Sequence, residues 1–121
     1  MKAVFGASAG VGKALSYALA EEGYDLLLVA RDKNAMEAIR SDICAKYPVD
    51  IEIVEWDFNS QTAIEFLNYI DTKAFNLTGL FYIAGFFSDS DKGLISVQEA
   101  ERLMKVNSYF PIQLINAFLA K

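Results

Sequence analysis

The feature that most constrains this chain is a glycine-rich turn within its first dozen residues. Residues 2–5 have the pattern of a short strand, glycine follows at positions 6, 10 and 12, and residues 11–22 show the apolar spacing of a helix. Backbone N–H groups at a helix start bind phosphate with the help of the helix dipole, and glycines let the phosphate approach. A turn without any ligand is the structural alternative. We expect a nucleotide phosphate here, bound by Gly6, Ser8, Ala9, Gly10, Val11 and Gly12.

A P-loop is the main alternative for such a turn. It requires the pattern G-x-x-x-x-G-K followed by serine or threonine. Counting from Gly6 places Val11 where the second glycine should be. Counting back from Gly12 and Lys13 places alanine at positions 7 and 14, where a glycine and a hydroxyl are needed. Neither register supplies a Walker lysine with a magnesium ligand, so we reject the P-loop.

Strand-like and helix-like segments alternate along the rest of the chain. A continuous apolar run at 26–30 predicts a strand covered on both faces, and the alternating apolar and acidic residues of 49–56 are typical of a sheet edge. The other predicted elements are helices at 32–47, 60–71 and 96–121 and a strand at 77–83.

The order β-α-β-α-β-α-β-α defines the fold class. Right-handed crossovers place the strands parallel in one sheet with helices on both faces, which is a three-layer α/β arrangement. By analogy with dinucleotide-binding folds, we expect a Rossmann-like sheet truncated to about four strands, in the order 3-2-1-4. The length of 121 residues corresponds to a single domain, residues 1–121, incomplete relative to the six-stranded fold.

Three single positions carry further expectations about the helices. Ser96 and Glu99 form an S-x-x-E capping box that opens the last helix. Ile64 is expected among the inward-facing residues of the helix at 60–71. Pro111 lacks an N–H group and is expected to kink the last helix in its middle.

Composition excludes several classes of function. The net charge is −5 and the basic residues do not cluster, which argues against nucleic-acid binding. The chain has no histidine, so it contains neither a histidine-based triad nor a histidine metal site, and we expect no metal. No run of apolar residues is long enough to span a membrane, the start lacks the long apolar stretch of a signal peptide, and Cys44 is the only cysteine. These features favour the cytoplasm.

The glycine turn resembles the fingerprint T-G-x-x-x-G-x-G of the short-chain dehydrogenase/reductases. Gly6, Gly10 and Gly12 match its three glycines, and Phe5 replaces the threonine. The resemblance extends over nearly the whole chain. It implies a domain that binds NAD or NADP and, in the intact enzyme, hydride transfer between that cofactor and an alcohol or carbonyl compound.

The end of the second strand is where this family distinguishes its cofactors. An acidic residue at position 30 would bind the ribose hydroxyls of NAD, but the residue is Ala30. Arg31 would face the 2′-phosphate of NADP with a bidentate guanidinium. The resemblance therefore implies NADP rather than NAD, although Arg31 could also be an ordinary solvated surface residue.

Other positions match family segments around the cofactor. Asp57 and Phe58 resemble the pair of an aspartate and an apolar residue that holds the adenine, and the alternative is that Asp57 caps the next helix. Ala84 and Gly85 resemble the end of the N-A-G segment beside the nicotinamide ribose, with Ile83 in place of the asparagine.

The catalytic residues of the family are mostly missing. Asn107 matches the helix asparagine that supports the active-site lysine through water, and an ordinary polar helix residue is the alternative. The serine and the Y-x-x-x-K helix that perform proton transfer are expected beyond Lys121. Tyr69 and Lys73 form a Y-x-x-x-K string by chance, on a helix before the fourth strand.

The last predicted helix, 96–121, carries apolar residues all around it, and Tyr82, Phe86 and Phe87 lie near the end of the fourth strand. One sheet face cannot cover so many apolar side chains. In the family this helix commonly packs against its twin. We therefore expect a homo-oligomer formed through this helix, or a missing C-terminal half that covers it.

Three functions remain open from the sequence. The first is the cofactor-binding portion of an NADP-dependent oxidoreductase, without turnover of its own. The second is a non-catalytic nucleotide-binding or self-associating module that is complete as it stands. The third, a sugar-nucleotide enzyme of the extended branch, usually has the spacing G-x-x-G-x-x-G, which Gly6, Gly10 and Gly12 do not match.

Overall fold

The computed structural model describes residues 1–85 and 96–120. They divide into two compact units, described here one at a time. Met1–Trp56 and Phe75–Ala84 form the first, which we call the sheet unit. Asp57–Ala74 and the chain from Gly85 onward form the second, which we call the helical unit. The predicted aromatic residues Phe86 and Phe87 lie outside the described residues.

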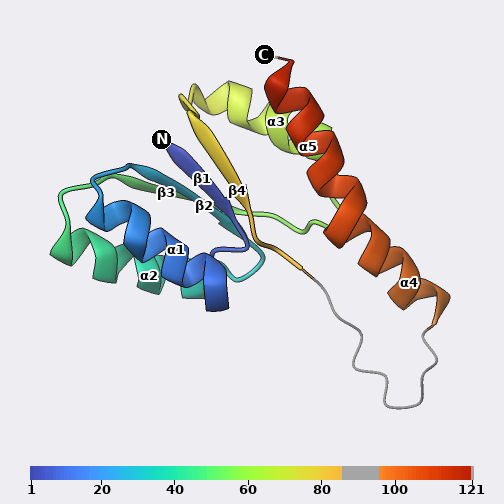
Figure 1. The fold of residues 1–121 in the computed structure, drawn as a ribbon, viewed down its shortest axis with the longest axis horizontal. Coiled ribbons are helices and arrows are strands. Elements are labelled where there is room, and N and C mark those ends of the chain that lie inside the picture. Colours follow the sequence, from blue (N-terminus) through green and yellow to red (C-terminus); the bar gives the residue numbers. More distant parts are fainter. Residues whose placement is uncertain (86–95, 121) are drawn as a thin grey trace. The chain divides into compact units, whose positions relative to one another are not determined.

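The sheet unit is built on four parallel strands in the order β3-β2-β1-β4 (Figure 1). This confirms the predicted Rossmann-like sheet and its strand order. The strands are β1 (Lys2–Phe5), β2 (Leu26–Ala30), β3 (Ile51–Glu55) and β4 (Gly79–Tyr82). β1 and β2 match their predicted bounds. β3 and β4 each begin two residues later and end one residue earlier than the predicted 49–56 and 77–83, because strand pairing ends where the connecting turns begin.

Burial along the strands follows the predicted roles. Every residue of β2 is buried, as its continuous apolar run predicts. β3 lies at the edge of the sheet, where the exposed carboxylates of Glu52 and Glu55 discourage pairing with another strand. The register pairs Ala30 at the end of β2 with Glu55 at the end of β3, so the two residues lie side by side.

Helices α1 (Gly10–Glu21) and α2 (Lys33–Lys46) lie on the same side of this sheet (Figure 1). Their predicted bounds, 11–22 and 32–47, differ from these by one residue at each end. The buried positions of α1 are small, namely Gly12, Ser16 and Ala20. Small side chains let the helix lie close to the strands. α2 instead contributes large apolar residues to the core, namely Met36, Ile39 and Ile43.

The helical unit contains α3 (Ala63–Lys73), α4 (Val97–Met104), a π-helical turn (Lys105–Tyr109) and α5 (Phe110–Leu119). The predicted capping box is present, since Ser96 Oγ accepts a hydrogen bond of 3.1 Å from the Glu99 N–H. Among the described helices, none combines the length and apolar character that a membrane crossing requires.

One expectation for these helices was wrong. Ile64 is 57% exposed, because α3 begins at Ala63 and turns a different stripe inward. The buried residues of α3 are Ala63, Phe66, Leu67 and Ile70. Pro111 lies within the continuous helical stretch formed by α4, the π-helical turn and α5. It stands just after the π-helical turn, in which the Phe110 N–H donates to the Lys105 carbonyl five residues back. The wider turn adapts the helix to a residue that has no N–H to donate.

Substitution of Gly12 tests how tightly the sheet unit is packed. A Cβ atom at this position would lie 1.9 Å from the carbonyl oxygen of Gly6. Gly12→Ala should therefore lower the free energy of unfolding by about 3 kcal/mol, as severe overpacking does, measured by urea titration. Gly10→Ala is the control, because a Cβ there meets nothing within 4 Å and only the φ of +55° is unfavourable. It should cost about 1 kcal/mol. Equal losses for both variants would contradict the close packing.

Candidate nucleotide-binding site

The turn between β1 and α1 is shaped by two close approaches. Gly6 has a φ of +90°, and a Cβ atom there would lie 2.6 Å from the amide nitrogen of Ala84. Gly12 packs in turn against the carbonyl of Gly6. Gly10 is different, because the space beside it is open and only its φ of +55° calls for glycine. Gly6 and Gly12 therefore hold the turn together, and Gly10 leaves its outer side accessible.

The N-terminus of α1 has no side-chain cap. Ala9 is the N-cap residue and has no side-chain acceptor, and the first turn contains no acidic residue. The helices α2, α3 and α4 are all capped, by Asp32, Thr62 and Ser96 respectively. The first N–H groups of α1 thus remain available to an anion from outside the helix. This is the donor arrangement that a phosphate requires, and Ser8 stands half-buried beside it.

The end of β4 completes this turn. The Phe5 carbonyl accepts hydrogen bonds from both Ile83 N–H and Ala84 N–H, at 2.8 and 2.9 Å. These bonds hold Ala84 next to Gly6, so the structure brings the predicted residues of the glycine turn and Ala84 together. Gly85 follows in the chain but belongs to the helical unit and is exposed. Ile83 is 37% exposed at this edge of the sheet.

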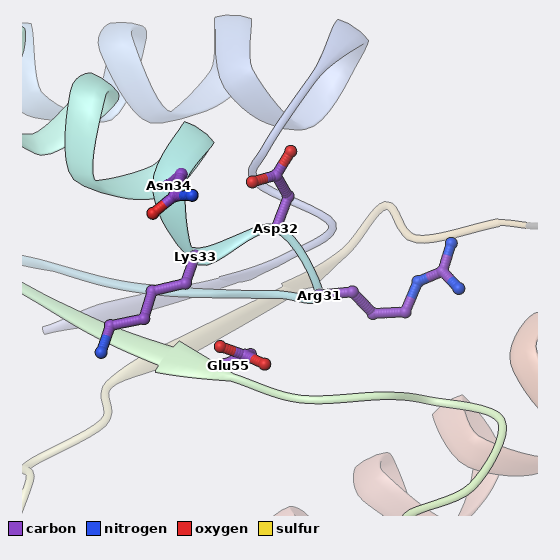
Figure 2. A pocket seen from close by; sticks show the side chains of 5 residues that line it. All are labelled: Arg31, Asp32, Lys33, Asn34 and Glu55. Atoms are coloured by element: carbon purple, nitrogen blue, oxygen red, sulfur yellow. The ribbon is translucent and has the colours of Figure 1, made fainter.

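A second element of the site lies where β2 ends. Arg31, Asp32, Lys33, Asn34 and Glu55 line an open depression of about 530 Å³ (Figure 2). The Asp32 carboxylate accepts a 3.0 Å hydrogen bond from the Ala35 N–H and so caps α2. Within the described parts of the chain, the Arg31 guanidinium forms no ion pair, and its side chain is exposed. A cation is therefore available where the sequence predicts one.

Asp57 and Phe58 belong to the helical unit. Asp57 Oδ1 accepts a 2.8 Å hydrogen bond from the Asn59 N–H, and the Asp57 N–H donates to Gln61 Oε1. Asp57 therefore orders its own turn and does not cap α3, because Thr62 does. The ring of Phe58 is buried edge-to-face against Phe110, with centroids 5.0 Å apart.

The remaining predicted residues also lie in the helical unit. Asn107 is exposed in the π-helical turn. The chance Y-x-x-x-K string lies on the exposed surface of α3, as predicted, with Lys73 Nζ 5.3 Å from the centroid of the Tyr69 ring. Lys73 is in the last turn of the helix, where a cation interacts favourably with the dipole.

Sequence reasoning missed Lys33, Asn34 and Glu55 in the depression. Lys33 and Asn34 follow Arg31 closely in the sequence, whereas Glu55 comes from β3, whose end lies beside the end of β2 in the sheet order 3-2-1-4. The pairing of Glu55 with Ala30 follows from that order once the register is known.

Residues 2–121 match the sequence profile of the short chain dehydrogenase family. The chain belongs to this family. The match covers both the glycine turn and the helical unit, and the family binds dinucleotide cofactors.

Individual relatives agree with this assignment. A very-long-chain 3-oxoacyl-CoA reductase of Eremothecium gossypii is 27% identical over 126 residues, which cover 94% of this chain and 36% of that protein. A bulky-bulky ketone specific alcohol dehydrogenase from Comamonas testosteroni has a similar structure, with a TM-score of 0.89 and 26% identity over 98% of this chain and 48% of its own.

A short-chain dehydrogenase from Sphingobium yanoikuyae, solved in complex with NADPH, shares the fold with a TM-score of 0.83 and 24% identity. The alignment covers 96% of this chain and 45% of that one. The present chain thus spans about half the length of these solved structures and about a third of the Eremothecium reductase.

Proposed function

We propose that this chain is the NADP(H)-binding portion of an oxidoreductase that transfers hydride between the cofactor and an alcohol or carbonyl compound. The observation that carries the proposal is the uncapped N-terminus of α1 behind a glycine turn whose outer side is open. Family membership supplies the chemical class. Two of the related proteins are named for a 3-oxoacyl-CoA substrate and for ketones, both of them carbonyl compounds.

NADP is favoured over NAD by the end of β2. Ala30 offers no carboxylate to ribose hydroxyls, and the exposed cation of Arg31 follows it directly. A guanidinium binds a phosphate through two parallel hydrogen bonds, which an unphosphorylated ribose cannot use. The NADPH complex of the structurally similar Sphingobium protein agrees with this preference.

The other contacts to the cofactor are assigned by the family resemblance. Asp57 and Phe58 would hold the adenine, Ala84 and Gly85 would lie along the nicotinamide ribose, and Asn107 would support the catalytic lysine. All 121 residues would then belong to a single nucleotide-binding domain. The lone cysteine agrees with a cytoplasmic location.

We further propose that the 121 residues alone turn over no substrate. None of these residues matches the family's catalytic serine, and the one Y-x-x-x-K string lies on the surface of α3. Cofactor binding without proton transfer cannot complete the reaction. A non-catalytic module remains the alternative, but the family match gives it no support.

The apolar surface of the last helices supports self-association. Met104, Ile112, Ile115 and Leu119 are exposed along α4 and α5, at spacings that fall on one stripe. Apolar stripes of this kind commonly mark protein–protein contacts. We propose that two copies of the chain associate through this stripe, or that a further segment of a longer protein covers it.

The cofactor preference is tested by titration calorimetry with NADPH and NADH. The unmodified chain should bind NADPH about ten-fold more tightly, the effect of one charge-assisted contact. Arg31→Ala should remove that preference by weakening NADPH binding alone. Arg40→Ala is the matched control, because Arg40 pairs with Glu37 on α2 and does not line the depression. Equal affinities for the two cofactors in the unmodified chain would contradict the NADP assignment.

Self-association is tested by light scattering after size-exclusion chromatography. Ile112→Glu places a charge in the exposed stripe and should shift the chain from dimer to monomer at micromolar concentration, because burying an unpaired charge costs several kcal/mol. Ile64→Glu on α3 is the control, since Ile64 is exposed to nearly the same extent, 57% against 58%. The Ile64→Glu variant should remain a dimer. A monomeric unmodified chain would contradict the association of two copies.

A further inference from the structure

The depression at the end of β2 contains a carboxylate that the proposed NADP preference does not use. Glu55 is the last residue of β3, and it lies in register beside Ala30 of β2. It lines the same depression as Arg31 and Lys33 (Figure 2). The negatively charged carboxylate of Glu55 therefore lies in the depression in which a 2′-phosphate is expected.

Of the two carboxylates in this depression, one is already engaged. Asp32 accepts the capping hydrogen bond of α2. Glu55 is exposed, and within residues 1–85 and 96–120 it forms neither an ion pair nor a side-chain hydrogen bond. The Glu55 carboxylate is thus available to interact with a bound nucleotide.

The two cations of the depression do not converge on one point. In Figure 2, the side chain of Arg31, just after β2, and that of Lys33, the first residue of α2, extend in opposite directions, and Glu55 lies between them in this view. Because Glu55 lines the same depression as both cations, a phosphate bound there would experience repulsion from its carboxylate.

We propose that Glu55 is a specificity-determining residue that supplies, from β3, the carboxylate that position 30 lacks. A carboxylate accepts hydrogen bonds from the two hydroxyls of an unphosphorylated ribose and repels a 2′-phosphate. The pocket then accepts both NADPH and NADH, with a preference for NADPH that comes from Arg31 and Lys33 and that Glu55 limits. This inference rests on the proposed binding of a dinucleotide by this chain.

The test compares Glu55→Gln with Glu52→Gln by titration calorimetry. Glu52 is exposed on the same strand and does not line the depression, so its loss changes the net charge equally without changing the pocket. Glu55→Gln should tighten NADPH binding about three- to ten-fold and weaken NADH binding about three-fold, and the gain for NADPH should shrink at high salt. Glu52→Gln should leave the ratio of the two affinities unchanged.

The possible results separate the two proposals. Binding of both cofactors with the same ratio in Glu55→Gln and in the unmodified chain would overturn the role of Glu55 and leave the dinucleotide site in place. Failure of the unmodified chain to bind either cofactor would overturn the proposed function, and the inference with it. A thermal melt of each variant confirms that the exposed substitutions leave the fold intact.

Discussion

The close contact between Gly12 and the Gly6 carbonyl is the constraint on which the rest of the site depends. It brings the first turn of α1 against the end of β1, and the contact of Gly6 with Ala84 joins the end of β4 to the same point. Two hydrogen bonds to the Phe5 carbonyl fix that junction. The start of α1 therefore lies at the carboxyl end of β1, without a side chain to cap it. Neighbouring glycines thus have different roles. Gly6 and Gly12 allow close packing within the turn, whereas Gly10 leaves the outer side of the turn open to a ligand.

Charge at the neighbouring strand ends complements this anion site. The helix N-terminus can bind any phosphate, because backbone N–H groups recognise charge rather than the identity of the ribose. Discrimination between dinucleotides must therefore come from side chains. In the proposed site these are Arg31 and Lys33, which would favour a phosphate, and Glu55, which would oppose it. The register places Glu55 beside Ala30, so under this proposal residues at the ends of two strands, β2 and β3, determine the choice of cofactor.

Much of this arrangement could be predicted from the sequence, because it follows from local patterns. The glycine spacing, the apolar run of β2 and the capping serine of α4 each specify a conformation by themselves. The strand order followed from the alternation of elements and from analogy with dinucleotide folds. The structure confirms all of these.

What could not be predicted depends on contacts between segments. The inward face of α3 is set by where Thr62 caps the helix, and this turned Ile64 outward. The π-helical turn before Pro111 depends on how the preceding helix accommodates a missing donor. The position of Glu55 in the depression required the register of β2 and β3, which no local pattern specifies. The roles assigned to Asp57, Phe58, Gly85 and Asn107 still rest on the family resemblance.

The central claim, that the start of α1 binds the phosphates of the cofactor, is tested most directly by Val11→Glu. Val11 is 69% exposed in the first turn, so a carboxylate fits there and should raise the free energy of unfolding by about 0.5 kcal/mol through the helix dipole. The same carboxylate occupies the anion site, so NADPH affinity should fall at least about ten-fold. Gln98→Glu at the second position of α4 is the control and should leave affinity unchanged. Unchanged NADPH affinity in Val11→Glu would contradict the account.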